Sequence, residues 1–371
     1  MPWEINVAAV RGRQRRLLEV MQRQGLDAVV VSHRNQVQWL TGLYYGHTFE
    51  PAAALLASGH TIAVIPGRKM PEVKSVDETH GYEAQSHSTL RNDQRQKSSA
   101  VLLEALQAHG SLKRVGVEFS QFSLHLSQKL SAELSDIEPS LFELRRRKDA
   151  DELAAIKRAI GATAAMYVRA REIIKPGVSE LEVFNALQAT AVESLGEMLT
   201  GTGNDYQCGA RGGPPRQGRV AADGELYILD LGPAYRGYYA DNCRAVAVNR
   251  RPTPAQLDAW KRIVEVLNMV RQEVRPGVRC RAIFDRAQQM LDRAKPTAVF
   301  DHHLGHGIGL FPHEAPHLNP NWDDVFEVGD TFTAEPGLYG DELRAGIRLE
   351  ENYHVTATGV DVLTSMIPLD L

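Results

Sequence analysis

In residues 1–146, apolar residues occur first at helical spacing and then in several short runs. Residues 8–24 carry apolar side chains at helical spacing, and Gly25 follows as a typical helix stop. Short runs rich in apolar and β-branched residues predict strands separated by Gly, Pro and polar turns. These runs are residues 26–32, 39–45, 52–58, 61–67 and 114–118. With a further helix around residues 97–108, the pattern predicts an α/β domain.

The pattern changes sharply near residues 143–150, where the sequence reads ELRRRKDA and a long helical pattern begins at about Asp149. We interpret the basic run at 145–148 as a short solvated hinge. A chain of 371 residues has room for two domains, each with its own core. The sequence therefore predicts one domain over residues 1–146 and another over residues 147–371.

The second predicted domain contains an internal repeat. A long helical pattern ends in KPGV at 175–178, and 100 residues later another ends in RPGV at 275–278. A second helix follows each of them, and the first of these opens with Ser179 and Glu182, the pattern of a capping box. The repeat predicts two related α+β halves around a pseudo-two-fold axis.

Each half also places two carboxylates at matching positions. A glycine and a strand lead to Asp230 in the first half and to Glu335 in the second, over the same six-residue interval. After a Gly/Tyr turn, the next strands carry Asp241 and Glu350. Asp230 and Asp241 are equidistant from a turn centred at residues 235–236. Glu335 and Glu350 are equidistant from a turn near residues 342–343. We therefore expect two cross-strand pairs, with Cβ atoms about 4.5–5.5 Å apart.

Four carboxylates in one place repel one another unless a cation neutralises them. The stretch 300–316, FDHHLGHGIGLFPHEAP, adds four imidazoles among glycines, at His302, His303, His306 and His313. Read alone, this stretch also fits a His-rich surface loop, and each acid fits a solvated strand end. The carboxylates with His306 form a hard, oxygen-rich set that suits two divalent ions, Mn²⁺, Co²⁺, Fe²⁺ or Zn²⁺. Two such ions sharing a water predict metal-assisted hydrolysis, with an amide as the expected substrate.

These residues lie in motifs that resemble those of the pita-bread metallopeptidases, a family that includes methionine aminopeptidase, aminopeptidase P, prolidase and the metal-free creatinase. The motifs are ILDLG at 228–232, GHGIG at 305–309, HEAP at 313–316, AEPG at 334–337 and GIRLEE at 346–351. The resemblance covers nearly the whole chain. It implies an α+β fold, in which a pita-bread catalytic domain with a pseudo-two-fold repeat follows a smaller creatinase-like α/β N-terminal domain.

The resemblance also implies roles for single residues. The metal ligands would be Asp230, Asp241, His306, Glu335 and Glu350. The cofactor would be two divalent metal ions, with Mn²⁺ as the first choice. Glu335 would carry a proton between the bridging water and the leaving amine, and His302 and His313 would steady the substrate carbonyl. Arg348 would pair with a substrate carboxylate through its bidentate fork. The pattern assigns no role to His303, which we interpret as structural.

The sequence departs from the peptidase pattern before the first ligand strand. Peptidases of this family normally carry a substrate-contacting histidine there, often as Pro-His. This chain has no histidine between His125 and His302, and it reads GARGGPP at 209–215. Asn242 and Cys243 stand where Ile-Thr is usual, and we interpret Cys243 as a packed small residue.

Two functions therefore stay open. The first is a prolidase-like or aminopeptidase P-like hydrolase that cleaves the Xaa-Pro amide bond of dipeptides or short peptides. The intact His302, His313 and Arg348 favour it. The second is a metal-dependent enzyme acting on a small non-peptide metabolite, similar to ectoine hydrolase or dimethylsulfoniopropionate lyase, and the missing histidine favours it. A non-enzymatic interaction module is the hypothesis from another class, and failure to bind a divalent metal would support it.

Composition narrows the expected partners and compartment. A net charge of −4 argues against nucleic acid as the main partner, and no apolar stretch reaches the length of about 18 residues typical of a membrane span. Three cysteines without CxxC spacing suit a reducing compartment. The first residues lack the apolar region of a signal peptide, so we expect a cytoplasmic protein. The resemblance implies a homodimer, in which Trp39, Tyr44 and Tyr45 either line a neighbouring site or belong to a core.

Overall fold

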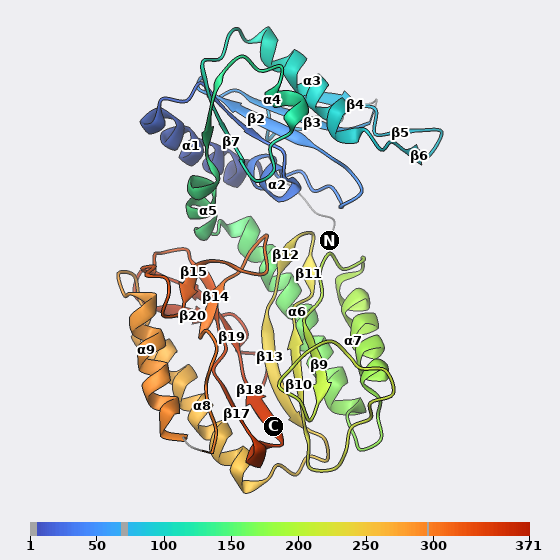
Figure 1. Cartoon of the computed structure of the whole chain (residues 1–371), viewed down its shortest axis with the longest axis vertical. Coiled ribbons are helices and arrows are strands. Elements are labelled where there is room, and N and C mark those ends of the chain that lie inside the picture. The colour runs from blue at the N-terminus through green and yellow to red at the C-terminus, as the bar shows by residue number, and fades with distance from the viewer. Residues whose placement is uncertain (1–5, 68–72, 295–296) are drawn as a thin grey trace. The chain divides into compact units, whose positions relative to one another are not determined.

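The computed structural model describes residues 6–67, 73–294 and 297–371. The chain divides into two compact units, Met1–Arg145 and Arg146–Leu371. In Figure 1 the colours from blue to green follow the N-terminal unit, and those from green to red follow the C-terminal unit. None of the helices within the described ranges is long and apolar enough to cross a membrane.

A six-stranded mixed sheet forms the centre of the N-terminal unit. Its strand order is β4-β3-β2-β1-β7-β8. The strands are β1 (Ala28–Val31), β2 (Ala52–Leu56), β3 (Thr61–Pro66), β4 (Glu78–Tyr82), β7 (Arg114–Val117) and β8 (Glu133–Asp136). The pairs β1–β2 and β2–β3 are antiparallel, and the other three are parallel. A short ribbon, β5 (Gln85–Ser86) with β6 (Thr89–Leu90), lies outside this sheet.

Five helices accompany this sheet in the described part of the unit. They are α1 (Val7–Gln24), α2 (Arg34–Thr41), α3 (Gln94–Ala108), α4 (Leu124–Ser127) and α5 (Glu138–Arg146). The side chain of Asn6 caps α1 by accepting a hydrogen bond from the backbone N–H of Ala9, and Gly25 ends the helix with a φ of 65°. The predictions for residues 8–24, 97–108 and the strands around β1, β2, β3 and β7 are confirmed.

The prediction of a strand at residues 39–45 is wrong. Residues up to Thr41 belong to α2, which begins after His33 and ends at Gly42, where φ is 75°. A short apolar run does not distinguish a strand from a buried helix, and here the two capping residues decide. Trp39 is fully buried in this helix, so it is a core residue.

The C-terminal unit contains two helix pairs, and Figure 1 shows them flanking the strands. The first pair is α6 (Ala150–Ile173) with α7 (Glu180–Leu195), and the second is α8 (Pro254–Glu273) with α9 (Cys280–Leu291). A three-stranded sheet of order β13-β10-β9 consists of β9 (Asp205–Cys208), β10 (Leu226–Leu231) and β13 (Asn242–Ala247).

A five-stranded antiparallel sheet belongs to the second half, in the order β15-β14-β16-β19-β20. Its strands are β14 (Gly305–Gly307), β15 (Glu314–Leu318), β16 (Thr331–Ala334), β19 (Glu351–Val355) and β20 (Val360–Val362). Each half also has a two-stranded ribbon. The ribbons are β11 (Ala234–Tyr235) with β12 (Tyr238–Tyr239) and β17 (Gly337–Gly340) with β18 (Ala345–Arg348).

Backbone hydrogen bonds repeat between the two halves. The N–H of Gly177 donates to the carbonyl of Ala221 at 2.8 Å, and the N–H of Gly277 donates to the carbonyl of Phe326 at 2.9 Å. The helix that follows the first glycine begins with the predicted capping box, in which Ser179 and Glu182 exchange side-chain and backbone hydrogen bonds. The internal repeat predicted from KPGV and RPGV is therefore confirmed.

The two halves meet where the carboxylates lie. The N–H of Glu350 donates to the carbonyl of Cys243 at 2.9 Å, and the side chain of Asn242 donates to the carbonyl of Glu350. The side chain of Asn352 in turn donates to the carbonyl of Asp241. These bonds join the first half to the second beside two of the predicted ligands.

The interpretation of residues 145–148 as a solvated hinge is wrong. Arg145, Arg146 and Lys148 are buried. The guanidinium of Arg146 binds the carboxylate of Asp330 at 2.8 Å, and Lys148 Nζ binds Glu314 Oε1 at 2.5 Å. Buried charges need such partners, and in both pairs the partner comes from a strand region more than 160 residues away along the chain. The pattern of a local charged run cannot show those partners.

Candidate metal centre

Side chains from both halves of the C-terminal unit line one cavity of about 300 Å³. Seven predicted site residues are among them: Asp230, Asp241, His302, His306, His313, Glu335 and Arg348. Glu350 completes the predicted set, because one of its carboxylate oxygens lies within 4.8 Å of ligand atoms of His306 and Glu335. The structure therefore brings together every residue that the sequence singled out for the site.

The register of the first hairpin differs from the prediction. Asp230 lies opposite Cys243, and Leu231 lies opposite Asn242, so Asp230 and Asp241 do not form a directly opposed pair. The hairpin turns at Arg236 and Gly237, whose φ values are 48° and 87°. Two central residues with positive φ are typical of a tight type I′ hairpin turn. This places the turn one residue later than predicted and makes the two aspartates diagonal neighbours.

The register of the second hairpin agrees with the prediction. Gly337 lies opposite Arg348 in the ribbon β17–β18, and Ala334 lies opposite Glu351 in the pair β16–β19. Glu335 and Glu350 fall between these two pairs in the same register. Their expected cross-strand relation is confirmed.

The imidazole of His306 faces two of the carboxylates. Its Nδ1 lies 3.1 Å from the carbonyl oxygen of Gly307, and because a carbonyl only accepts, Nδ1 carries the proton. Its Nε2 lies 3.4 Å from Glu335 Oε1 and 3.7 Å from Asp241 Oδ2. In the neutral ring, the lone pair of Nε2 thus points at Glu335 Oε1 and Asp241 Oδ2. A bound cation would accept electron pairs from this nitrogen and from both oxygens.

Several buried carboxylate oxygens at the site receive no hydrogen bond. These are both oxygens of Glu350 and Oδ1 of Asp230. Burial raises the pKa of Glu350 well above its ordinary value, and the charges of Asp241 and Glu335 raise it further. Burial likewise raises the pKa of Asp241 strongly, with the charges of Asp230 and Glu335 adding to the shift. Buried acids without donors are costly, so the residues present fit a pair of divalent cations.

Glu335 differs from the other acids because two imidazoles contact it. Burial alone would raise its pKa, but the adjacent imidazoles of His303 and His306 outweigh burial and hold the pKa well below the ordinary value. The His303 Nε2 to Glu335 Oε1 distance is 2.9 Å. The resemblance gave His303 no role at the site, yet this residue lines the cavity and contacts the proposed proton carrier.

His302 and His313 are neutral imidazoles at the cavity wall. Burial lowers the pKa of each to about 4, and the neighbouring His306 lowers that of His313 further. The Nδ1 of His302 donates to the carbonyl of His303 at 2.7 Å, so its Nε2 accepts from the hydroxyl of Tyr339 at 3.0 Å. His313 stacks on His306 with ring centroids 3.6 Å apart. Both rings are therefore held in place without carrying charge.

The guanidinium of Arg348 is already surrounded by acceptors. Its Nη2 donates to Asp230 Oδ2 at 2.9 Å and also to Asp205, and its Nη1 lies 3.3 Å from the hydroxyl of Tyr339. Side chains of this arginine and of both aspartates are largely buried. Arg348 thus lies between a predicted metal ligand and a second acid from β9.

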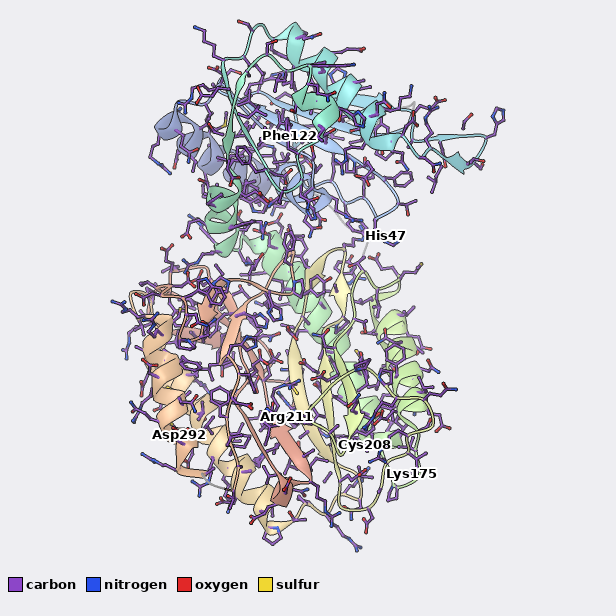
Figure 2. The ribbon with its side chains drawn as sticks, in the orientation of Figure 1. His47, Phe122, Lys175, Cys208, Arg211 and Asp292 are labelled. Atoms are coloured by element: carbon purple, nitrogen blue, oxygen red, sulfur yellow. The ribbon has the colours of Figure 1, made fainter. Side chains whose placement is uncertain are left out.

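A second arginine on the cavity wall, Arg211, comes from the GARGGPP loop (Figure 2). Its guanidinium lies over the ring of Tyr339 at 4.1 Å and pairs with Asp301, and the side chains of this pair are about half exposed. The loop is fixed to β9, because the N–H of Gly213 donates to Asp205 at 2.6 Å. The loop that replaces the Pro-His pattern therefore places the positively charged guanidinium of Arg211 at the cavity.

Sequence reasoning missed Asn204, Asp205, Arg211 and Tyr339, all of which line the cavity. The glycines of the GARGGPP loop and the tyrosine of the repeated Gly/Tyr turn were signals that could have indicated two of them. Cys243 is fully buried, and burial raises the pKa of its thiol well above the ordinary value. This agrees with its interpretation as a packed residue.

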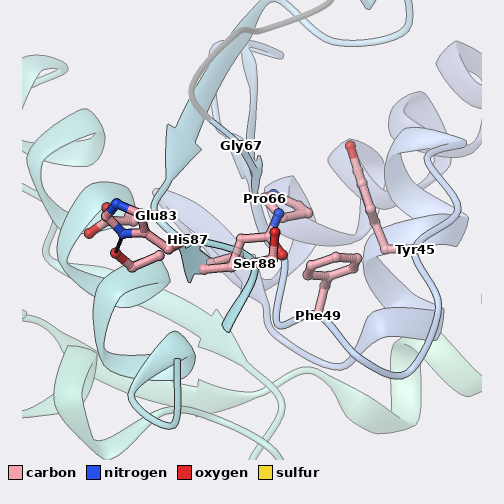
Figure 3. A pocket seen from close by; sticks show the side chains of 10 residues that line it. Tyr45, Phe49, Pro66, Gly67, Glu83, His87 and Ser88 are labelled. Carbon is pink, nitrogen blue, oxygen red and sulfur yellow. Dashed lines mark hydrogen bonds between the residues drawn. The ribbon is translucent and has the colours of Figure 1, made fainter. Parts of the chain in front are cut away.

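A larger cavity, of about 560 Å³, lies in the N-terminal unit (Figure 3). Tyr45, Phe49 and Pro66 form one side of it, and Glu83 and His87 are among the polar residues. It brings together no set of carboxylates and imidazoles like that of the smaller cavity. Size therefore does not identify the site, whereas the ligand chemistry of the smaller cavity does.

Residues 154–357 match the model of metallopeptidase family M24, and residues 13–146 match that of the creatinase/prolidase N-terminal domain. The chain belongs to metallopeptidase family M24. The match covers more than half of the chain and includes every predicted metal ligand.

The chain is similar to several known proteins. It is 31% identical over 266 residues to the agropine synthesis cyclase of Rhizobium rhizogenes, a match that covers 66% of this chain and 65% of that protein. It is 26% identical over 359 residues to an uncharacterized peptidase of Staphylococcus aureus strain MW2, covering 94% of this chain and 97% of the relative.

Two solved structures share the fold over nearly the whole chain. The Xaa-Pro dipeptidase from Bacillus anthracis has a TM-score of 0.80 at 21% identity and covers 96% of this chain and 97% of its own. Aminopeptidase P from E. coli has a TM-score of 0.80 at 20% identity, and the match covers 99% of this chain and 96% of the E. coli chain. These likenesses confirm the predicted pita-bread fold with a creatinase-like N-terminal domain.

Proposed function

We propose that this protein is a dinuclear-metal-dependent hydrolase that cleaves the Xaa-Pro amide bond of dipeptides or short peptides. The observation that carries the proposal is the convergence of the five predicted ligands in one buried cluster, in which Oδ1 of Asp230 and both carboxylate oxygens of Glu350 lack donors. The ligands are Asp230, Asp241, His306, Glu335 and Glu350. The fold shared with an Xaa-Pro dipeptidase and with aminopeptidase P supports the choice of bond.

The ligand set suits Mn²⁺ first, with Co²⁺, Zn²⁺ and Fe²⁺ as alternatives, because it is rich in hard oxygen donors and contains one imidazole. Two divalent ions bound here would lower the pKa of a water molecule and polarise a substrate carbonyl. The residues that would hold them are Asp230, Asp241, His306, Glu335 and Glu350.

The side chains around the ligands perform the remaining steps. Glu335, held by His303, would take a proton from the attacking water and pass it to the leaving nitrogen. His313 is uncharged and stacked on His306, so it can hold the carbonyl oxygen and the tetrahedral intermediate by a hydrogen bond without competing for the cation sites. His302 would take the same role once its Nε2, which here accepts from the hydroxyl of Tyr339, carries the proton.

Two arginines are available to recognise a substrate carboxylate. Arg348 was expected to do so, and in the structure it also binds Asp205 and Asp230. Arg211 is more accessible, because its side chain is about half exposed and pairs with an exposed acid. We propose that Arg211 shares this role with Arg348 and takes the place of the missing histidine at the substrate side of the cavity.

A second function has a specific observation in its favour. The agropine synthesis cyclase is 31% identical to this chain, and its name is not that of a peptidase. With the GARGGPP loop in place of Pro-His, this supports a metal-dependent enzyme of a small non-peptide metabolite. The cavity of about 300 Å³ has room for such a substrate and for a dipeptide.

Hydrolysis of a substrate panel separates the two functions. Metal-stripped protein is reloaded with Mn²⁺, Co²⁺ or Zn²⁺ and given Ala-Pro, Met-Pro, an Xaa-Pro tripeptide and a non-proline dipeptide, with Asp230→Ala as the blank. Turnover of the proline substrates alone is the expected result, and the tripeptide distinguishes an aminopeptidase from a dipeptidase. Tight binding of two metals without peptide turnover would favour the metabolite enzyme.

We also propose that the protein is a homodimer, on the basis of its family resemblance. Light scattering of the full chain at working concentration is the test. A mass equal to that of one chain would contradict the proposal.

A further inference from the structure

Three imidazoles surround one carboxylate in the N-terminal unit, remote in sequence from every residue of the proposed catalytic site. Glu78 Oε1 lies 2.8 Å from His60 Nε2 and 2.8 Å from His109 Nε2. Glu78 Oε2 lies 2.9 Å from His80 Nε2. The rings of His60 and His109 are close to each other, with centroids 4.7 Å apart.

Two of these side chains lie on a strand, and the other two lie directly beside regular elements. Glu78 and His80 belong to β4, which pairs with β3 from Ile62↔Glu78 onward and is an edge strand of the sheet. His60 comes directly before β3, and its carbonyl accepts a hydrogen bond from the N–H of Leu56 at 2.9 Å. His109 caps the C-terminal end of α3. Three elements therefore fix the positions of the four side chains.

The ligand atoms are spaced as a transition-metal site requires. Nitrogen atoms of His60 and His109 and an oxygen of Glu78 all lie within 4.8 Å of one another. Ligand atoms at about 2.0–2.1 Å from a tetrahedral Zn²⁺ are about 3.3 Å apart, so the observed contacts of 2.8 Å need to open only slightly to admit an ion. The side chains of His60, Glu78 and His109 are about one quarter to one third exposed, which leaves access for an ion and for water.

We propose that His60, Glu78 and His109 bind one divalent transition-metal ion, with His80 holding the second carboxylate oxygen of Glu78. The imidazole-rich set favours Zn²⁺ or Cu²⁺ over Mn²⁺, in contrast to the oxygen-rich centre of the C-terminal unit. A bound ion would connect the end of α3 to the edge strand β4 and so stabilise the N-terminal unit against unfolding. The site is independent of the proposed function, because none of its residues belongs to the catalytic cavity.

Zinc stoichiometry of the full chain tests this site. Metal-stripped wild type, the His60→Gln/His109→Gln double variant and the control His125→Gln, which changes an exposed histidine of the same unit, are dialysed against Zn²⁺ and analysed for bound metal. We expect the double variant to bind one equivalent less than wild type and control, with unchanged turnover of the best substrate. Equal zinc content in all three proteins would overturn the proposal.

A copper spectrum gives a second readout. Cu²⁺ added to the full chain is observed by electron paramagnetic resonance, which counts the nitrogen ligands. Because the catalytic cavity also contains imidazoles, at His302, His303, His306 and His313, the spectrum of the wild type is compared with that of the His60→Gln/His109→Gln variant. A copper signal coupled to at least two nitrogens that is present in the wild type and missing from the double variant supports the site, and identical spectra of the two proteins contradict it.

Discussion

The two halves of the C-terminal unit carry the same carboxylate pattern in different surroundings. In the first half, Asp230 receives a hydrogen bond from Arg348. In the second half, two imidazoles contact the carboxylate of Glu335, whereas Glu350, which lies opposite it, receives no hydrogen bond at its carboxylate. Equivalent positions in the repeat therefore have opposite electrostatics: the pKa of Glu335 is lowered and that of Asp230 is raised.

The difference arises because the donors come from one half only. Arg348, His303 and His306 all belong to the second half, and one of them reaches across to Asp230 in the first half. The first half contributes Asp205 and Arg211 to the cavity wall. The repeat thus sets where the carboxylates lie, and the unequal distribution of their neighbouring arginine and imidazoles decides which acid can carry a proton and which ones need a cation.

Glu350→Gln should have the largest effect on turnover and on the stability of the metal-free protein. The variant to compare it with is Glu351→Gln, at the neighbouring residue. Glu350 has no donors, so removing its charge should stabilise the metal-free protein by about 1–3 kcal/mol while lowering metal-dependent turnover at least about 100-fold. Glu351 is paired with Arg244, so its substitution should destabilise the metal-free protein. Urea unfolding of both metal-free variants, with assays after reloading, measures these effects. Destabilisation by Glu350→Gln would contradict the account.

His303→Ala should lower turnover by about 10- to 100-fold, because the imidazole holds a proposed ligand and proton carrier in place. Loss of its hydrogen bond removes a contribution that lowers the pKa of Glu335. The pKa therefore rises, and the acidic limb of the pH profile for kcat/KM moves to higher pH. His317→Ala, which changes a histidine bound to Asp324, is the control. An unshifted limb in His303→Ala would show that His303 does not act on Glu335.

Replacing each arginine by lysine separates positioning from substrate recognition. Arg348→Lys should lower kcat on Ala-Pro and on Ala-Pro amide alike, since it loses the contact with Asp230, and should also raise KM for Ala-Pro through its share in carboxylate recognition. Arg211→Lys should raise KM about 10-fold for Ala-Pro only, because the amide lacks the carboxylate. Equal effects of Arg211→Lys on the two substrates would rule out carboxylate recognition by this residue.

The smallest effect concerns the turn that sets the first hairpin register. Gly237 has a φ of 87°, so Gly237→Ala should cost about 1 kcal/mol of unfolding free energy. Gly161→Ala lies inside α6, where an added Cβ meets no atom within 4 Å, and should stabilise by up to about 1 kcal/mol. Chemical denaturation of both variants provides the comparison. A neutral Gly237→Ala would mean that the positive φ does not restrict the turn.

Much of the fold could be predicted because the signals are local. Helix caps such as Gly25, the repeated glycine and carboxylate intervals, and short apolar strands act over a few residues, and the five proposed ligands followed from them. The second hairpin was placed correctly because its turn is symmetric about residues 342–343. The first was not, because positive φ at Arg236 and Gly237 selected a turn one residue away.

The remaining features depend on contacts that no local pattern contains. The buried charges of Arg146 and Lys148 have partners on distant strands, so a charged run was mistaken for a solvated hinge. Arg211 reaches the cavity because the N–H of Gly213 ties its loop to Asp205. The apolar residues 39–41 form the end of a helix because of their caps. In each case tertiary structure decided between alternatives that the sequence left open.

Electron paramagnetic resonance of the metal-stripped chain titrated with Mn²⁺ tests the central claim most directly. The claim is that both halves jointly hold two ions through Asp230, Asp241, His306, Glu335 and Glu350. Two ions about 3.5–4 Å apart are magnetically coupled, so the account predicts the spectrum of a coupled Mn²⁺ pair at two equivalents. The same titration of Asp241→Ala should give no coupled pair. Spectra of isolated Mn²⁺ alone in the wild-type chain would contradict a shared dinuclear centre.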